Sequence, residues 1–278
     1  MKDTKASGAA KKTSAKTGAK AAASKTAAKP VSKSQSAKTA AKDKAPAPKA
    51  GNVVKADRPS AKPAAKPIDK AAVPKAAVPE LKKGDYFKFG SYYQENSSKK
   101  TPIEWMVLKK SGSKVLLISR YALDCKLYHH VCVDMTWENC DLRKWLNGEF
   151  LRNAFTAAEH KKIAVTKLAN DNNAQCGTFG GNSTEDRVFC LSLAEAGSLF
   201  KDDAARKCVP TPYAVGKGAY KSDSYFIDGR GCCWWWLRSP GHYQNGASDV
   251  NSNGALDPLG LIVYDDHNAV RPALWVDL

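Results

Sequence analysis

The stretch that most constrains the fold is residues 231–241, which read GCCWWWLRSPG. Three adjacent indoles are too apolar for an ordinary exposed loop, and the proline bars a continuing helix. In a strand, Trp234 and Trp236 would face one side and Trp235 the other, with Arg238 following Trp236 on its face. We therefore predict a core strand that ends in a turn. The alternative is that one face of this strand, with the loop after it, forms a binding surface.

The positive charge of the chain is concentrated in its N-terminal segment. Residues 1–83 contain 21 Lys or Arg against 5 Asp or Glu, whereas the rest contains 23 against 22. The first segment consists mainly of Lys, Ala, Ser, Thr and Pro, and it has no aromatic residue. Such a composition buries too little apolar surface to offset chain entropy. We predict that residues 1–80 are a disordered basic tail and that residues 81–278 form one domain.

The basic tail resembles, in composition, the Lys-, Ala- and Pro-rich tails of linker-histone-like proteins. Such arms bind phosphate backbones without reading sequence, and their affinity depends strongly on salt. The alternative is a solvating linker, or an arm attracted weakly to any acidic surface. Non-specific nucleic-acid binding through residues 1–80 is therefore one predicted interaction. The lack of aromatic residues argues against specific single-strand binding by stacking.

The sequence favours a cytoplasmic protein without a membrane span. No apolar segment follows Lys2 and Lys5 as a secretory signal requires, and no stretch approaches the roughly 20 apolar residues of a membrane helix. Eight cysteines, all after residue 120, fit this compartment if they are reduced and mostly buried. The adjacent Cys232 and Cys233 would not normally bridge each other.

The periodicity of residues 81–278 predicts short strands and helices separated by long loops. Alternating patterns predict strands at residues 84–90, 187–191, 260–264 and 273–277, and a β-hairpin at 103–109 and 114–120 with Trp105, Val107, Leu116 and Ile118 inward. Apolar spacing predicts a helix over 142–155 that Gly148 interrupts, and capping boxes at Thr156 and Ser192 start two more. Residues 169–186 are predicted as a long loop that we do not expect to be buried, and residues 202–231 as a polar loop region with little regular structure. The fold class is therefore α+β with an antiparallel sheet and two or three short helices.

Six stretches together resemble the bacterial family of domains of unknown function DUF6273. They are IEW (103–105), LLIS (116–119), TWENC (136–140), LRKWLN (142–147), WWLRSPG (235–241) and VRPALW (270–275). The order of the closing motifs is also similar, more loosely, to C-type-lectin-like folds of the formylglycine-generating-enzyme type. That resemblance implies a domain whose first and last strands pair and which displays an irregular loop surface.

Folds of this type serve in ligand binding and target recognition, including the variable proteins of diversity-generating retroelements. By this resemblance, the loops after the tryptophan strand and near the C-terminus are the expected binding surface. The predicted ligand-binding residues are Ser239, His242, Tyr243, Gln244, Asn245, Asn251, Asn253, Asp265, Asp266, His267 and Asn268. The predicted structural core of the site is Trp234, Trp235, Trp236, Arg238, Arg271 and Trp275.

One stretch is rich in the histidine and cysteine residues that bind zinc, but its spacing does not fit a zinc site. Cys125, His129, His130, Cys132 and Cys140 lie close in sequence, but their spacing matches no paired zinc pattern. The simpler interpretation is surface histidines beside two buried cysteines. We therefore predict no metal and no cofactor.

Two further groups of residues carry side chains that could form a chemical site. Cys232 and Cys233 would point to opposite faces of a strand, unlike the closely placed cysteine pair of formylglycine-generating enzymes, so packing is their expected role. Asp257, Asp265 and Asp266 carry the oxygen ligands that calcium prefers, but the sugar-binding signatures of calcium-dependent lectins are absent. We predict a solvated turn there and assign no catalytic residue.

Arg238 and Arg271 follow apolar strand residues and each precedes a proline within two positions. An arginine in such a place either pairs with an internal carboxylate or binds one from a ligand. The internal pair, with a residue such as Glu104 or Asp249, is favoured because buried charges are nearly always paired.

The function predicted from these patterns is non-enzymatic recognition of a protein or carbohydrate, with Tyr243 and His242 as anchors. The second hypothesis is a nucleic-acid-associated protein in which the basic tail supplies affinity. The third is a cysteine- or metal-dependent enzyme of formylglycine-generating type. Deletion of residues 1–80, thiol counting and metal analysis discriminate among them.

Overall fold

A computed structural model describes residues 80–278 of the chain. The predicted basic tail and its nucleic-acid binding therefore fall on residues that lie outside the described part, apart from Glu80. Within residues 80–278 the domain contains both strands and helices and is mostly sheet, so the α+β class is confirmed. None of the described helices is long and apolar enough to cross a membrane.

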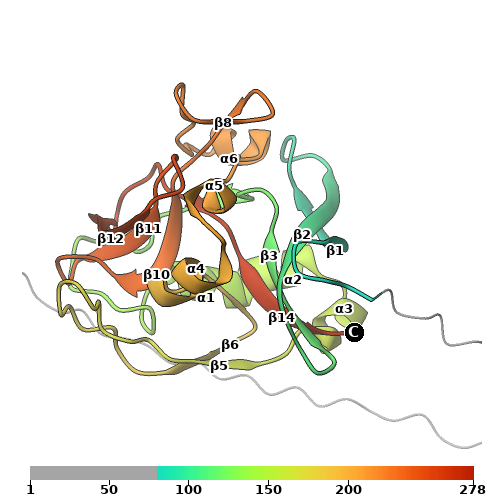
Figure 1. The fold of residues 1–278 in the computed structure, drawn as a ribbon, viewed down its shortest axis with the longest axis horizontal. Coiled ribbons are helices and arrows are strands. Elements are labelled where there is room, and N and C mark those ends of the chain that lie inside the picture. The colour runs from blue at the N-terminus through green and yellow to red at the C-terminus, as the bar shows by residue number, and fades with distance from the viewer. Residues whose placement is uncertain (1–79) are drawn as a thin grey trace, which may run out of the picture. The chain divides into compact units, whose positions relative to one another are not determined.

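The first sheet holds the N-terminal hairpin and the C-terminal strand. Its order is β1 (Tyr86–Tyr93), β2 (Lys100–Ser111), β3 (Lys114–Ser119), β14 (Ala273–Asp277) and β7 (Val188–Phe189), with every neighbouring pair antiparallel. The predicted hairpin is present as β2–β3. Figure 1 shows β14 beside β3, although the two are far apart in sequence. The expectation that the first and last strands pair is wrong, because β1 pairs with β2 at the sheet edge.

The second sheet is organised around the tryptophan strand. Its order is β12 (Leu256–Ile262), β11 (Gly246–Val250), β10 (Trp235–Pro240), β13 (Ala269–Val270) and β4 (Asp124–Cys125). Every residue of β10 is buried, as the strand prediction requires. The pair β10–β13 is parallel and the others are antiparallel. The one predicted sheet is thus two five-stranded sheets. Two separate two-stranded sheets accompany them: β5 (Thr166–Leu168) pairs with β6 (Thr184–Asp186), and β8 (Phe226–Ile227) pairs with β9 (Arg230–Gly231).

The described helices are short and more numerous than predicted. They are α1 (Asp141–Trp145), η1 (Leu146–Phe150), α2 (Leu151–Ala154), α3 (Ala157–Lys162), α4 (Leu193–Leu199), α5 (Asp203–Arg206) and α6 (Pro212–Gly216). Gly148 does not interrupt the first helical run, because a π-helical turn, η1, carries the chain continuously from α1 into α2. The capping boxes of Thr156 with Glu159 and Ser192 with Glu195 are both formed, so local sequence correctly placed α3 and α4.

The hydrophobic core is continuous between the two sheets. Trp105, Val107, Leu116 and Ile118 are buried as predicted. Leu117, on the opposite face of β3, is fully buried as well. Both faces of β3 are therefore buried within the domain.

Two segments predicted as loops contain more regular structure or more buried residues than their polar composition suggests. Residues 169–186 include β6, and Asn173, Thr184 and Asp186 are buried there. Residues 202–231 contain α5, α6, β8 and β9. The prediction failed because the polar side chains of these segments bond to the chain itself rather than to water, as in the Asp202 and Thr211 caps of α5 and α6.

Candidate functional site

The indoles of the tryptophan run fill the interior and are tethered to backbone oxygens. Trp236 donates from Nε1 to the Lys126 carbonyl at 2.9 Å, and Trp235 donates to the Arg206 carbonyl at 3.3 Å. Both side chains are fully buried. Trp234, just before the strand, is half-buried and stacks on Tyr220 with ring centroids 4.0 Å apart. The run is thus a platform rather than a contact surface.

Arg238 is buried and forms an internal ion pair, but its partner is Glu195 of α4 rather than Glu104 or Asp249. Both terminal guanidinium nitrogens contact the two carboxylate oxygens, one of them at 3.1 Å. The same guanidinium donates to the Cys190 carbonyl at 3.1 Å and to that of Ala169 at 3.2 Å. A bidentate pair with these further acceptors neutralises the buried charge internally, and of the three guanidinium nitrogens only Nε lacks a hydrogen-bond partner.

The predicted alternation of the strand does not continue as far as Arg238. The register of β10 with β11 shifts between Trp236 and Pro240. Arg238 then contacts α4, the helix whose C-cap residue Phe200 packs on Trp235. An irregular register of this kind redirects side chains, and the sequence carries no sign of it.

Arg271 is buried without a carboxylate partner among the described residues. It donates to the carbonyls of Ser119 and Arg206, each at 3.0 Å. Its guanidinium carbon lies 5.1 Å from the Trp235 ring centroid and 5.5 Å from that of Phe200. The predicted carboxylate pair is therefore replaced by backbone oxygens and cation–π contacts. Trp275, also predicted for the core of the site, lies in β14 of the other sheet.

The predicted ligand-binding residues are not brought into one surface. His242, Tyr243, Gln244 and Asn245 form the turn between β10 and β11. Asn251 and Asn253 lie in the turn at the opposite end of β11, where the Asn253 side chain caps Ala255. Asp265, Asp266, His267 and Asn268 follow β12 and approach β4, because the Asp266 carbonyl accepts from the Cys125 thiol at 3.1 Å. The prediction grouped these residues because their types identify them as turn residues, and turn composition carries no information on where each turn lies in the fold.

The turn of residues 241–245, which we call the Tyr243 turn, is held rigidly. The His242 amide donates to the Leu259 carbonyl at 2.8 Å, and the Gly246 amide donates to the Tyr243 carbonyl at 3.0 Å. Gln244 donates from Nε2 to the Met135 and Phe179 carbonyls, each at 2.9 Å. Tyr243 itself is 71% exposed and packs edge-on against His242. The fold thus displays a large aromatic side chain on a fixed backbone.

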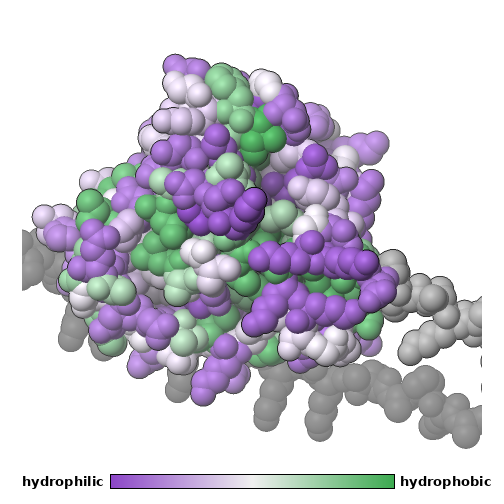
Figure 2. All heavy atoms as spheres, viewed as in Figure 1, coloured by the Kyte–Doolittle hydropathy of each residue, from purple (hydrophilic) through white to green (hydrophobic). Residues whose placement is uncertain are grey.

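Further apolar side chains are exposed on the segments that hold this turn. Phe179 is 56% exposed and Leu259 is 51% exposed. We call Phe179, His242, Tyr243 and Leu259 the Tyr243 surface. Figure 2 shows hydrophobic side chains gathered where Figure 1 places β11 and β12. The sequence pointed to His242 and Tyr243 but missed Phe179 and Leu259, whose backbone carbonyls accept from the Gln244 side chain and the His242 amide of the turn.

A cavity of about 440 Å³ lies between the segment 171–175, the start of α4 and the ends of β10 and β12. Its lining includes Gln175, Leu193, Ser239, Leu256 and Pro258. Ser239, predicted as a ligand contact, is buried and accepts from the Leu193 amide at 3.0 Å. The Cys176 thiol lies 3.4 Å from His242 Nδ1, so the cavity and the Tyr243 surface share the segment 171–179.

Asn173 fixes that segment against the strands. Its Nδ2 donates to the Pro240 carbonyl at 2.8 Å and to the Pro258 carbonyl at 2.7 Å. Its Oδ1 accepts from the amides of Gln175 and Cys176. One buried asparagine thereby sets the cavity wall, and nothing in its local sequence marked it.

Asn268, also predicted as a ligand contact, is fully buried and donates from Nδ2 to Asp249 Oδ2 at 3.2 Å. The other carboxylate oxygen of Asp249 and the Asn268 amide oxygen have no hydrogen-bond partner. Burial raises the pKa of Asp249 to about 7, against the effect of the Asn268 hydrogen bond, and the carboxylates of Asp257 and Asp265 raise it further. This pair belongs to the interior of the second sheet rather than to a binding surface.

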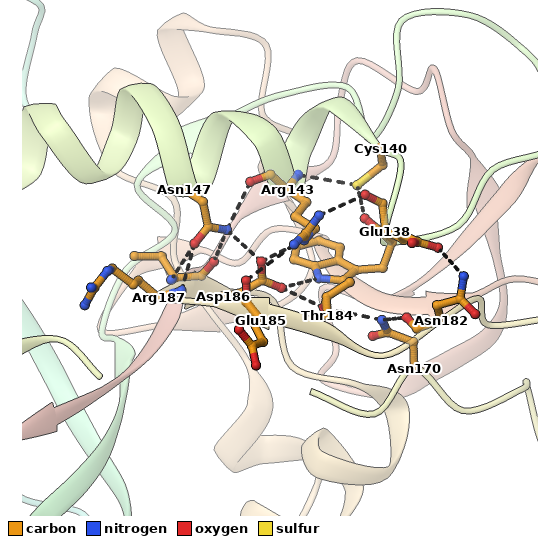
Figure 3. Close-up of polar contacts among 12 residues, drawn as sticks. Glu138, Cys140, Arg143, Asn147, Asn170, Asn182, Thr184, Glu185, Asp186 and Arg187 are labelled. Atoms are coloured by element: carbon orange, nitrogen blue, oxygen red, sulfur yellow. Dashed lines mark hydrogen bonds and ion pairs between the residues drawn. The ribbon is translucent and has the colours of Figure 1, made fainter. Parts of the chain in front are cut away.

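A second buried carboxylate, Asp186, gathers the residues of two family-like stretches. It accepts from Trp137 Nε1 at 2.9 Å, Arg143 Nε at 2.7 Å, Asn147 Nδ2 at 3.2 Å and Thr184 Oγ1 at 2.9 Å. Figure 3 shows Arg143 and Asn147 reaching from the helix towards Asp186 on β6. Hydrogen bonds from four donors satisfy this fully buried carboxylate and anchor the helical run α1–η1 to β6. The role of Asp186 is therefore structural.

The histidines and cysteines of residues 125–140 are only partly brought together in the fold. Cys125 bonds to backbone carbonyls, and Cys140 caps α1 by accepting from the Arg143 amide at 3.3 Å. Burial raises the pKa of each of these two thiols to about 12. His129 and His130 instead converge on Asp141, the one group of metal-binding side chains among the described residues.

The cysteines of the described residues are free and mostly buried, as expected for reduced thiols. Cys233 contacts Cys208 rather than its neighbour Cys232. Burial raises the pKa of the Cys233 thiol well above its usual value. This pair is closed to solvent, which removes the accessible thiolate that cysteine chemistry requires.

The family model for the domain of unknown function DUF6273 matches residues 112–278. No curated protein and no solved structure matches the chain. The matched region contains the Asp186 network, the tryptophan strand β10 and the C-terminal strand β14. The chain therefore belongs to the DUF6273 family.

Proposed function

We propose that residues 81–278 form a non-enzymatic recognition domain that binds a protein partner through the Tyr243 surface. The observation that carries this proposal is the 71% exposure of Tyr243 on a turn fixed by backbone and side-chain hydrogen bonds. A rigid exposed tyrosine supplies a large contact area at low entropic cost. Exposed aromatic anchors of this kind dominate the energetics of protein interfaces.

The side-chain amides of the Tyr243 turn already contact groups of the same chain, which favours a protein ligand over a carbohydrate ligand. The Gln244 amide donates to two carbonyls of its own chain, and the Asn245 amide contacts the Cys132 thiol at 3.5 Å. These groups are therefore engaged, whereas sugar binding requires several free donors and acceptors beside an aromatic ring. Phe179 and Leu259 add apolar area instead. An apolar surface without free amide groups fits the apolar centre of an interface with another protein.

The cavity beside Ser239 completes the proposed site. Its walls are mostly apolar, with Leu193, Leu256 and Pro258 among them, and it adjoins the segment that carries Phe179. An apolar side chain of the partner would enter this cavity while Tyr243 packs on the surrounding surface. Interfaces commonly combine a filled pocket with a neighbouring aromatic anchor.

The scaffold proposed for this role is C-type-lectin-like. The features that support it are the short helices, the long ordered loops and the return of β14 into the first sheet beside β3. The edge position of β1 departs from the expected pairing of first and last strands. The proposal therefore rests on loop display rather than on the complete strand order.

A quantitative capture experiment tests the recognition function. Full-length protein and its Tyr243→Ala variant are used to capture partners from host lysate after nuclease treatment and at high salt, which suppresses binding by the basic tail. Captured proteins absent from the bead control are expected to fall at least tenfold with Tyr243→Ala. Tyr86→Ala removes another half-exposed tyrosine, in β1 of the first sheet, and should leave capture unchanged. Equal capture by all three proteins refutes the proposed surface.

The charge distribution supports a second function, non-specific nucleic-acid binding by residues 1–80. Nearly all of the net charge of +17 lies in the first 83 residues. Binding of double-stranded DNA at low salt should be lost when residues 1–80 are deleted, and the intact chain should lose affinity steeply as salt rises. Equal DNA binding by the two chains would show that the tail is not responsible.

A further inference from the structure

His129, His130 and Asp141 form a compact cluster on the described domain. Their three ligand atoms lie within 4.8 Å of one another. Asp141 Oδ2 is 2.9 Å from His129 Nδ1 and in closer contact with His130 Nδ1. We propose that these three side chains bind a divalent transition-metal ion of the zinc class.

The fold fixes both sides of this cluster before any ion binds. The His129 amide donates to the Val263 carbonyl at 2.8 Å, which ties the histidine pair to the chain leaving β12. Asp141 is the first residue of α1, whose start is capped by Cys140. The His130 amide also donates to Asp141 Oδ2 at 3.2 Å. Because the ligands sit on anchored backbone, little conformational entropy remains to be lost on binding.

The hydrogen bonding within the cluster is incomplete at His129. Its side chain is only 12% exposed, and Nδ1 has no hydrogen-bond partner even though Asp141 Oδ2 is 2.9 Å away. The two atoms are therefore close without satisfying each other by a hydrogen bond. A metal ion between them would be coordinated by both.

The donor set matches zinc chemistry. Imidazole nitrogen and carboxylate oxygen bind Zn²⁺ at about 2.0–2.2 Å, so neighbouring ligand atoms in a tetrahedral site lie about 3.3 Å apart. The ligand atoms of the cluster lie within 4.8 Å of one another, a range that includes this separation. Three protein ligands leave one position for water or for an external group. His130 is 67% exposed, so the open side of the site faces solvent.

The charges around the cluster permit a cation. Lys144 contacts Asp141 through the other carboxylate oxygen, Oδ1, at 3.4 Å, which leaves Oδ2 for the ion. The helix that begins at Asp141 is short, and its capping is complete without a metal. The site lies beside the Tyr243 turn, because the Val263 amide donates to the Asn245 carbonyl at 3.0 Å.

Zinc titration of the metal-free full-length protein tests the proposal directly. Calorimetry and metal analysis after gel filtration should find one Zn²⁺ bound per chain. His130→Gln and Asp141→Asn should each weaken binding at least tenfold. The exposure of His130 makes its substitution safe for folding, and unchanged far-ultraviolet circular dichroism of both variants verifies this.

Control variants separate this site from other zinc-binding groups. His160→Gln, on α3, should bind zinc like the wild type. The double variant Cys132→Ser/Cys176→Ser removes the two accessible thiols and should also retain the site. Unchanged zinc affinity in the His130 and Asp141 variants, loss of the site in the thiol double variant, or no bound zinc would overturn the proposal. No partner takes part, so the result is independent of the recognition function.

Discussion

The buried carboxylate of Asp249 predicts that the stability of this domain falls between acidic and mildly alkaline pH. Asp249 is 1% exposed, and its pKa is raised from 3.8 to about 7 by burial. Between these two pH values the folded chain retains a proton that the unfolded chain has released. Stability therefore decreases as pH rises through this window, opposite to the usual behaviour of an ion-paired aspartate.

The magnitude follows from the same two pKa values. A pKa raised from 3.8 to about 7 corresponds to about 4 kcal/mol of unfolding free energy at most. This contribution is fully present below pH 3.8 and is lost by about pH 7. Asp249→Asn removes the titration and keeps the shape of the side chain. Its amide also offers a donor to the Asn268 oxygen that lacks a partner.

Urea unfolding of the full-length protein at a series of pH values from about 4.5 to 8 measures this effect. Over this range the unfolding free energy of Asp249→Asn minus that of the wild type should rise with pH by about 3 kcal/mol. All other titrating groups are common to both proteins and cancel in the difference. Asp134→Asn, which changes an exposed aspartate, should follow the wild type. Parallel curves for Asp249→Asn and the wild type would refute the reasoning.

Two further predictions concern stability, and urea unfolding at neutral pH checks both. Glu195→Gln should lower the unfolding free energy by about 2 kcal/mol, because it removes the carboxylate charge that pairs with the buried Arg238; the partial exposure of Glu195, a third, limits the loss. The control Glu159→Gln changes the matching capping box, which has no buried arginine, and should cost under about 1 kcal/mol. Equal costs would contradict the importance of the ion pair. Gly254→Ala should cost at least about 2 kcal/mol more than Gly112→Ala. Both glycines have positive φ, but a Cβ at Gly254 would lie 1.7 Å from the Asp203 carbonyl oxygen, and one at Gly112 meets nothing within 4 Å.

Elements specified by neighbouring residues could be predicted from sequence. The capping boxes at Thr156 and Ser192 started helices where expected, because the Glu three positions later supplies the reciprocal hydrogen bond. The β2–β3 hairpin followed from two apolar runs separated by a short turn. The burial of Trp235 and Trp236 followed from bulk alone. In each case the information lies within a few residues of the element.

Features that depend on contacts between distant segments could not be predicted. Arg238 was correctly expected to pair internally, but Glu195 lies in a separate helix and nothing near either residue identifies the other. Of the turns predicted as one surface, residues 241–245 and 251–254 lie at opposite ends of β11, because the strand between them sets their positions. Asn173 and Asp186 were placed in an exposed loop, since polar residues indicate solvent unless their partners are known.

The family-like stretches and the proposed contact residues occupy different places in the structure. Trp137, Arg143 and Asn147 lie within these stretches, and all three donate to the buried Asp186. The stretch 235–241 forms a fully buried strand, and the exposed Tyr243 comes two residues after it ends. Residues that anchor a scaffold must match one another, whereas an exposed turn fixed through backbone hydrogen bonds can change its side chains without loss of fold. The stretches that resemble the family therefore build the scaffold, and the proposed recognition function would be located in the turns between them.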